Sequence, residues 1–522
     1  MTGFELPGIS DVPEVGEVQV EDDDAEAPAP PRKKPRLDSL PPVTILAAGE
    51  KADVTSMRSE VDALGKRLQQ VFDDFGLSAK VVGAERGPTL TLFEVQLGTG
   101  VPVRKLRSQK DDLAVALGSH GVRVVFPLPG RTTVGVEVPN IKREAVRLKE
   151  VYQEADIGWE TNRLPMVLGR DTLGRLAVED LTSMPHMLIA GTTGSGKSVC
   201  LNSVLATLLL SRTPDQLRLI LVDPKQVELQ LFQDIPHLLC PVVTDMKRAP
   251  FVLDWSIRQM EDRLHLFKKV GVRDINAYNA LGEAEIKQRA GEDWDPDDPP
   301  SDLPYFVLVI DELADMMMVS AKEVETSVAR LAAKARAAGV HIMVATQRPS
   351  TDVVTGLIKT NLPVRMAFRV TSSIDSRVIL DESGAESLLG NGDFLYRPPG
   401  SGTLVRGQGA FVSEREVREI CDHLREHGKP EFLEELVQMR GATAASGAVD
   451  DPLFDEAVRV VLQSGRGSAS LLQRALSVGY TRASRLIDIM TEQGVLGPFI
   501  GSKAREVQIT MEEWEAQQKQ PQ

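Results

Sequence analysis

The chain has 522 residues, of which 75 are Asp or Glu and 60 are Lys or Arg, so its formal net charge is −15. This length suggests about three domains of roughly 150 residues each, long enough to bury sizeable cores. The composition excludes a collagen, a largely disordered chain and a disulfide scaffold. Three widely separated cysteines, Cys200, Cys240 and Cys421, lack metal-ligand spacing and suggest a reducing compartment.

Residues 1–42 are predicted to form a disordered tail that is acidic and rich in proline. Residues 1–50 contain 11 acidic and 4 basic residues, a net charge of −7 (4 − 11). We interpret the basic cluster at residues 32–36 as a solvated linker in preference to a DNA or lipid contact. The sequence contains no apolar run of about 18 residues, so we predict no membrane span. The N-terminus lacks the apolar core of a secretion signal.

Residues 43–150 are predicted to form a small α/β domain. Apolar residues recur at helical spacing over residues 56–75. Strand-like segments follow at residues 93–97, 122–126 and 133–138, with a Pro-Gly turn before the last of them. No catalytic constellation is found in this domain.

Residues 151–435 have the pattern of a mainly parallel, buried sheet flanked by helices, because short apolar runs alternate with helix-like segments. The apolar runs lie at residues 186–190, 217–222, 306–310, 341–345 and 364–370. The stretch at residues 292–302 is rich in acidic residues and proline and is predicted to be an exposed loop.

A glycine-rich segment in this domain fits the phosphate-binding pattern G-x-x-x-x-G-K-[ST] at every fixed position. Its residues, the candidate nucleotide contacts, are Gly191, Thr192, Thr193, Gly194, Ser195, Gly196, Lys197 and Ser198. The segment follows an expected strand and opens an expected helix, so successive N–H groups can face phosphates. We expect Lys197 to reach the β- and γ-phosphates of ATP and Ser198 to ligate Mg²⁺.

An acidic pair, Asp311 and Glu312, follows the apolar strand 305–310. We expect Asp311 to hold Mg²⁺, mainly through water, and Glu312 to orient or deprotonate the attacking water. An acidic pair at a strand end is often only solvated. Its place after the phosphate-binding segment favours the catalytic interpretation.

Two further polar residues follow other strands at the same expected sheet edge. Gln347 could sense the γ-phosphate, the alternative being an amide bonded to the backbone. Lys225 lies in an Asp-Pro-Lys sequence at the strand edge where open α/β sheets bind ligands. A contact with the ligand and a plain surface charge are equal alternatives for Lys225.

An arginine from a neighbouring subunit can complete hydrolysis by stabilising charge in the transition state. The sequence alone does not separate the candidates, which are Arg330, Arg336, Arg365 and Arg377.

The C-terminal part has a predicted flexible linker at residues 436–450, a winged helix at 451–510 and a short tail at 511–522. Residues 464–505 hold six basic and two acidic residues, a net charge of +4 (6 − 2) within an acidic protein. Basic residues at the start of a recognition helix can reach base edges in the major groove of DNA. The alternative is a winged helix that binds protein.

Together these residues resemble the FtsK/SpoIIIE family of bacterial DNA translocases. The resemblance covers about residues 43–509 and rests on specific strings besides the phosphate-binding segment. They are Ile235-Pro-His-Leu-Leu239, Val242-Val-Thr-Asp-Met-Lys247, Lys334-Ala-Arg-Ala-Ala-Gly-Val-His341, Ala345-Thr-Gln-Arg-Pro-Ser350, Thr355-Gly-Leu-Ile-Lys359, Gly384-Ala-Glu-Ser-Leu-Leu-Gly390 and Gly479-Tyr-Thr-Arg-Ala-Ser-Arg485.

The resemblance implies an α domain at residues 43–150, a RecA-like P-loop motor (β domain) at 151–435 and a winged-helix γ domain at 451–510. Family members form hexameric rings around double-stranded DNA and move along it by hydrolysing ATP with Mg²⁺. Their γ domain reads short oriented DNA sequences, which sets direction, and in some members it contacts a site-specific recombinase. The implied role is the movement of chromosomal DNA during segregation and cell division.

The resemblance also assigns residues by position. Lys197, Ser198, Asp311, Glu312 and Gln347 take the roles given above. Arg377 is the implied trans arginine, and Lys359 is expected to contact phosphates in the ring pore. The implied γ-domain contacts to DNA are Arg482, Arg485, Lys503 and Arg505.

The chain departs from the family pattern in three places, one of which is the acidic insert at residues 291–302. Family members usually carry N-terminal membrane helices, so we expect either a soluble member or one whose membrane segment is encoded separately. The expected location is the bacterial cytoplasm, with recruitment to the membrane or septum through a partner. Thr481 stands where an Asn is common in the γ domain, so the DNA motif that is read can differ.

Three alternatives stay open. A plasmid-transfer (conjugative) translocase shares all this chemistry. A protein-secretion ATPase of the same branch usually has several ATPase modules in tandem, whereas this chain has one. A DNA-binding regulator that uses ATP as a switch would not need Glu312.

Overall fold

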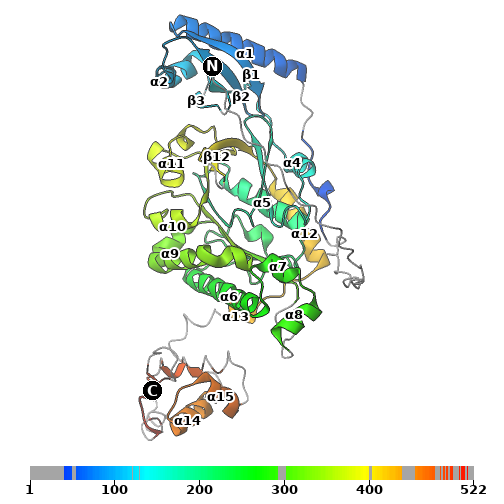
Figure 1. Ribbon diagram of the computed structural model, residues 1–522, viewed down its shortest axis with the longest axis vertical. Coiled ribbons are helices and arrows are strands. Elements are labelled where there is room, and N and C mark those ends of the chain that lie inside the picture. The colour runs from blue at the N-terminus through cyan, green and yellow to red at the C-terminus, as the bar shows by residue number, and fades with distance from the viewer. Residues whose placement is uncertain are drawn as a thin grey trace, which may run out of the picture. The chain divides into compact units, whose positions relative to one another are not determined.

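The computed structural model describes residues 40–49, 54–119, 121–128, 130–291, 301–398, 402–437 and 453–476, with further single residues and short stretches between 483 and 514. The chain forms two compact units, residues 1–437 and 438–522. Figure 1 shows their elements with the labels used here. Among the described residues, no helix is long and apolar enough to cross a membrane.

The first unit begins with a four-stranded antiparallel sheet of order β1-β2-β4-β3. Its strands are β1 (Ala79–Arg86), β2 (Leu90–Leu97), β3 (Arg123–Val125) and β4 (Val134–Pro139), and its helices are α1 (Val54–Asp74), α2 (Val103–Ser108) and α3 (Lys110–Leu117). Along β2, buried Phe93 and Val95 alternate with more exposed Glu94 and Gln96. The predicted helix and strands of this region are confirmed.

A nine-stranded sheet of order β6-β5-β13-β12-β11-β7-β10-β9-β8 follows. Its strands are β5 (Pro165–Asp171), β6 (Leu176–Asp180), β7 (His186–Ala190), β8 (Leu217–Val222), β9 (Tyr305–Ile310), β10 (Val340–Thr346), β11 (Val364–Phe368), β12 (Asp393–Arg397) and β13 (Val405–Gly409). The five strands predicted from apolar runs form the parallel part. The other four pair antiparallel and were not predicted, because strands such as β13 (VRGQG) lack a continuous apolar run.

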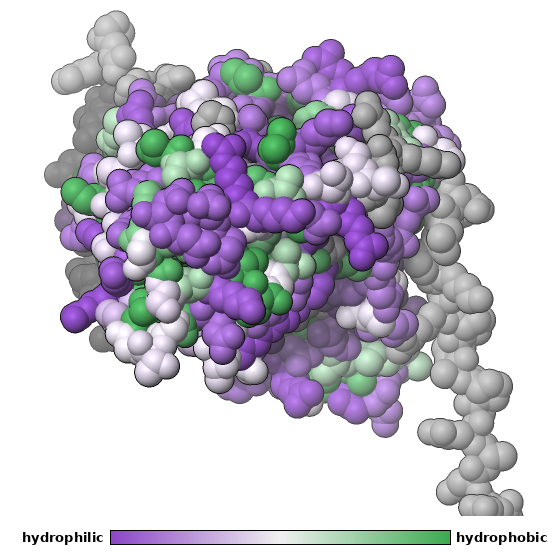
Figure 2. All heavy atoms as spheres, turned by 90° about the horizontal axis from the view of Figure 1, so that it is seen from above, coloured by the Kyte–Doolittle hydropathy of each residue, from purple (hydrophilic) through white to green (hydrophobic). Residues whose placement is uncertain are grey.

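Helices cover the nine-stranded sheet. They are α4 (Leu148–Glu154), α5 (Lys197–Ser211), α6 (Ala249–Val270), α7 (Ile275–Asn279), α8 (Glu283–Ala290), α9 (Leu313–Ala338), α10 (Gly356–Asn361), α11 (Ser373–Leu380), α12 (Glu414–His427) and α13 (Glu434–Val437). Helices α5 and α12 pack together in the main core, and α6 packs along α9, as Figure 1 shows. The face of the molecule visible in Figure 2 is mostly hydrophilic, with hydrophobic side chains in small separate groups.

Two sets of contacts join the N-terminal part of the first unit to the part built on the nine-stranded sheet. Arg406 on β13 lies between Glu137 on β4, at 2.5 Å, and Asp393 on β12, at 2.7 Å, with all three side chains at most 5% exposed. The short turn Val43–Ile45 precedes α1 in the chain but packs against α12, where the Ala47 amide donates to Glu416 at 2.7 Å.

The three cysteines are all buried and free of disulfides. Cys200 lies on α5 and Cys421 on α12, both inside the main core, while Cys240 lies in the segment after β8. Burial raises the pKa of each thiol to about 12.

The second unit has its own core. Helices α14 (Phe454–Ser464) and α15 (Ala469–Leu476) are followed by helical residues around Leu486 and Met490, and two antiparallel bridges, Gly467 to Arg505 and Leu496 to Val507, close the unit. This arrangement agrees with the predicted winged helix. Trp514 packs against Phe454, so this core includes a residue beyond position 510.

Candidate nucleotide-binding site

The phosphate-binding segment connects β7 to α5 at the carboxyl end of the parallel strands. β7 is buried along its whole length, so it fixes the start of the loop. Gly194 and Gly196 have φ values of 75° and 109°, which favour glycine, and a Cβ atom on Gly196 would clash with the backbone of Gly392. Helix α5 begins at Lys197, so the N–H groups of its first turn have no intrahelical partner and face the loop.

A cavity of 530 Å³ adjoins this loop. This volume lies within the range of small-molecule and cofactor sites. Besides residues 192–194 and 196–200 of the loop and α5, its lining comes from the small domain, the domain connection, the end of β10 and the β12–β13 region. Those residues are Thr89, Arg143, Glu144, Ala145, Val146, Gln347, Leu389, Gly390, Asn391, Gly392, Gln408, Gly409, Ala410 and Phe411.

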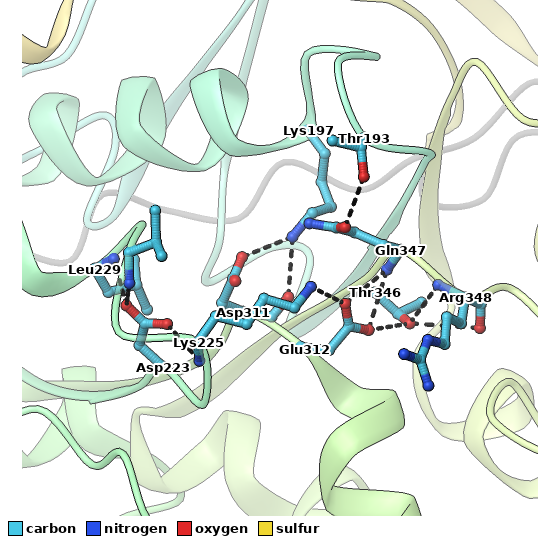
Figure 3. A network of polar contacts seen from close by, with 11 residues as sticks. Thr193, Lys197, Asp223, Lys225, Leu229, Asp311, Glu312, Thr346, Gln347 and Arg348 are labelled. Carbon is cyan, nitrogen blue, oxygen red and sulfur yellow. Dashed lines mark hydrogen bonds and ion pairs between the residues drawn. The ribbon is translucent and has the colours of Figure 1, made fainter.

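Lys197 and Asp311 form a buried ion pair in this site (Figure 3). The Lys197 Nζ lies 2.6 Å from Asp311 Oδ1 and 2.9 Å from the Asp311 carbonyl oxygen. Their side chains are 2% and 0% exposed. The second carboxylate oxygen of Asp311, Oδ2, is buried and has no hydrogen-bond partner within the described part of the chain.

This arrangement fits a hydrated Mg²⁺ ion. Magnesium prefers oxygen ligands and is usually bound through one or two carboxylates together with substrate phosphates and water. The free Oδ2 of Asp311 and the hydroxyl of Ser198 at the start of α5 are suitable donors. Among the described residues no cluster of three or more His, Cys, Asp or Glu side chains forms an all-protein metal site.

Glu312 lies beside Asp311 and is 1% exposed. Its Oε1 accepts hydrogen bonds from the Thr346 hydroxyl at 2.6 Å and from the Gln347 amide at 3.1 Å. Its Oε2 pairs with Lys225 Nζ at 2.8 Å. Burial raises the pKa of Glu312, but these hydrogen bonds outweigh burial, so the net pKa is lowered and the side chain is a carboxylate.

Gln347 joins the acidic pair to the phosphate-binding loop. Its side-chain Oε1 accepts a hydrogen bond from the Thr193 hydroxyl at 3.0 Å, while its amide N–H donates to Glu312. The structure therefore brings together, from separate strands and the loop, the residues predicted for the site: Thr193, Lys197, Asp311, Glu312 and Gln347 (Figure 3).

Three further residues complete this network. Lys225, for which the sequence left a ligand contact and a plain surface charge as equal alternatives, pairs with Glu312. Thr346, the residue before Gln347, holds the other Glu312 oxygen. The buried Asp223 accepts amide N–H bonds from Lys225, Val227 and Leu229 and so fixes the turn that carries Lys225. The Asp-Pro-Lys sequence at the same strand edge was the available signal.

The predicted trans arginine and pore lysine lie elsewhere. Arg377 is exposed on α11 and does not line the cavity of this single chain. Lys359 on α10 pairs with Asp381 at 2.8 Å, and Arg365 pairs with the same aspartate at 2.5 Å. Arg330 pairs with Glu261 at 2.9 Å.

Of the predicted DNA contacts in the second unit, Arg505 is described. Its backbone bonds to Gly467 in both directions, and its Nη1 donates to the Thr491 hydroxyl at 2.5 Å. Arg482, Arg485, Lys503 and the unusual Thr481 lie outside the described residues.

Three sequence models of one family match the chain. Residues 147–351 match the FtsK/SpoIIIE family, residues 40–140 the FtsK alpha domain and residues 448–510 the FtsK gamma domain.

Curated proteins match over most of this chain. A protein of Pseudomonas aeruginosa named DNA translocase FtsK is 44% identical over 492 residues, which are 90% of this chain and 60% of that protein. The DNA translocase SpoIIIE of Bacillus subtilis is 42% identical, covering 96% of this chain and 63% of its own length. The chain thus spans about three fifths of the length of these relatives.

Solved structures are more distant. The pCW3 conjugation coupling protein TcpA, in a monomer form with ATPγS, is 23% identical with a TM-score of 0.46, over 69% of this chain and 99% of that chain. The cytoplasmic domain of the type VII secretion ATPase EccC of Thermomonospora curvata is 24% identical with a TM-score of 0.42, over 52% of this chain and 32% of that chain.

Proposed function

The chain belongs to the FtsK/SpoIIIE family, and we propose that it is an ATPase that uses ATP hydrolysis to move double-stranded DNA. The observation that carries this proposal is the meeting of Lys197, Asp311 and Glu312 beside a cavity of nucleotide size. A binding module would need the phosphate loop, but it would not need a buried, anchored carboxylate at the position of Glu312.

The roles follow from the contacts. On ATP binding, Lys197 leaves Asp311 for the β- and γ-phosphates, which are the stronger anionic partner. Ser198 and Asp311 would hold Mg²⁺, which neutralises charge on the phosphates when bound. Glu312 accepts a proton from the attacking water, and Gln347, tied to Thr193 of the loop, senses the γ-phosphate.

The assembly and the DNA contacts are part of the same proposal. We place Arg377 at a neighbour's site in a homo-hexameric ring, because its exposed position on α11 leaves it available to another subunit. Lys359 would contact DNA phosphates by exchanging its partly exposed partner Asp381 for them. Arg482, Arg485, Lys503 and Arg505 would serve the γ domain.

The cellular task proposed is the movement of chromosomal DNA during segregation and division in the bacterial cytoplasm, with recruitment to the membrane or septum and a recombinase partner. A role in plasmid transfer would use the same site.

The test is the steady-state ATPase rate with and without long duplex DNA, beside Lys197→Ala. We expect strong stimulation by DNA that Lys197→Ala abolishes, with Lys268→Ala, an exposed lysine at the end of α6, as the matched control. Intact hydrolysis without any stimulation would contradict the DNA motor and favour a protein-translocating ATPase.

A deletion tests the second unit. Removing residues 451–522 should leave DNA-stimulated hydrolysis intact and abolish sequence-dependent direction of movement on DNA carrying oriented motifs. Unchanged direction in the deletion variant would refute the assignment of the γ domain.

A further inference from the structure

Glu312 is held in place independently of Lys225. Its Oε1 accepts from the Thr346 hydroxyl at 2.6 Å, the Gln347 amide N–H is shared between Oε1 at 3.1 Å and Oε2 at 3.2 Å, and the side chain is 1% exposed. Both donors belong to the end of β10 and the residue after it. Because this anchorage is buried and comes from one strand end, the carboxylate keeps its position when its other oxygen is released.

Lys225 is fixed in its backbone but free to move in its side chain. The Asp223 carboxylate accepts the N–H groups of Lys225 and Val227, at 3.1 and 3.0 Å, so the turn after β8 is rigid. The Lys225 side chain is 36% exposed, against 1% for Glu312. Of the two partners, the lysine is therefore the one that can leave, by rotating its flexible stem toward solvent or toward an anion.

The site contains two lysine–carboxylate pairs, Lys197 with Asp311 and Lys225 with Glu312. Lys197 occupies Asp311 Oδ1 and leaves Oδ2 without a partner in the described part of the chain. Lys225 is the only charged partner of Glu312 Oε2 among the described residues, and the other contact of Oε2 is the longer one, at 3.2 Å, with the shared Gln347 N–H. A carboxylate oxygen that already receives an ammonium N–H is a poor acceptor for a proton from water. Glu312 can use Oε2 on water only after Lys225 has left.

On the basis of the ATPase activity proposed above, we propose that Lys225 is a positioning residue that restrains Glu312, and that its departure from Oε2 is required for each hydrolysis step. The hydrolysis step breaks two bonds and forms two. One O–H bond of water breaks and its proton goes to Glu312 Oε2, the water oxygen forms a bond to the γ-phosphorus, and the bond from that phosphorus to the bridging oxygen of ADP breaks.

The experiment measures kcat and KM for ATP of the full chain without DNA. Lys225→Met keeps most of the aliphatic stem and removes the charge. We expect its kcat to rise about three- to tenfold, the size of effect that a partly exposed ion pair supports, with KM for ATP unchanged. Lys225→Arg restores the pairing and should return kcat to about the parent value, while Lys268→Met should match the parent.

A lowered kcat in folded Lys225→Met would show that Lys225 is a catalytic cation, and an unchanged kcat would show that it is a surface charge. Either result would refute the proposal that Lys225 restrains Glu312. Lys225→Gln gives a second neutral side chain if thermal unfolding shows that Lys225→Met does not fold. Adding Glu312→Gln to Lys225→Met should cancel the gain. If Glu312→Gln alone keeps the parent rate, the proposed catalytic role of Glu312 fails, which is a different result from failure of the restraint.

Discussion

Lys197 and Lys359 each pair with an aspartate, at 2.6 and 2.8 Å, but the surroundings of the two pairs differ. Lys197 and Asp311 are 2% and 0% exposed, whereas Lys359 and Asp381 are 26% and 52% exposed. A buried charge left without its partner costs several times more than an exposed one. The burial of the two pairs, more than their distances, therefore sets how much each lysine depends on having an anionic partner.

The sharpest test of this comparison replaces each lysine in turn. Lys197→Ala should lower the ATPase rate by about 1,000-fold or more, because the phosphates lose their positioned cation. Lys359→Ala should leave the rate without DNA unchanged. An ATPase rate that falls equally in both variants would contradict the distinction between the two pairs.

Glu312→Gln sharpens the assignment of the buried acidic pair. Removing a general base should lower kcat by about 100- to 10,000-fold. Nucleotide binding, measured with a fluorescent ATP analogue, should persist because Lys197 and the loop are untouched. Loss of binding together with hydrolysis would instead make Glu312 a structural residue.

Two arginines that each lie between two carboxylates, one buried and one exposed, test how burial affects the free energy of unfolding. Arg406 lies between two carboxylates at 5% exposure, and Arg131 lies between Glu85 and Glu94 at 43% exposure. Arg406→Met should lower the free energy of unfolding by about 3–5 kcal/mol, because it leaves buried Asp393 without its ion-pair partner and buried Glu137 with only the longer pair to Arg123, at 3.6 Å. Arg131→Met should cause no measurable change in urea unfolding. Equal losses would show that the buried arrangement has no special weight.

Replacing the more exposed lysine, Lys359, is expected to have a smaller effect, which is on DNA binding. Lys359→Ala should weaken DNA binding a few-fold and reduce the slope of log affinity against log salt by about 1, as expected when one phosphate contact is lost. Filter binding or fluorescence anisotropy at several salt concentrations measures both. An unchanged slope would remove Lys359 from the proposed pore contacts.

A further prediction concerns the dependence of stability on pH. Burial lowers the pKa of His186 to about 3 and that of His341 and His237 to about 4, from an ordinary value of 6.5. The unfolded chain therefore binds more protons below pH 6.5, and stability falls as pH falls from about 6.5 toward 4. His237→Gln should flatten this loss by up to about 1.4 kcal/mol per pH unit. Exposed His265→Gln should leave it unchanged.

Local pattern was enough for much of the fold. The five parallel strands have continuous apolar runs, and the phosphate-binding segment has a pattern whose every position has a physical reason. The strands β5, β6, β12 and β13 were missed because they alternate or carry glycine and charge, and only their partners make them strands. A sequence window does not contain that tertiary information.

The same limit applies to the site. Asp311 and Glu312 could be named because they are adjacent and follow a buried strand. The pairing of Lys225 with Glu312 spans 87 positions, and no local spacing encodes it. Likewise, Thr89 lines the nucleotide cavity from the small domain, which was predicted to hold no catalytic residues. Such contacts depend on how separate elements meet.

The burial of all three cysteines has a practical consequence for following this protein in motion. Since the thiols of Cys200, Cys240 and Cys421 are shielded and their pKa is raised to about 12, a maleimide dye at neutral pH should leave them unreacted in the folded chain. One cysteine placed on an exposed residue would then carry the only label. Single-molecule fluorescence could be applied without first replacing any native cysteine.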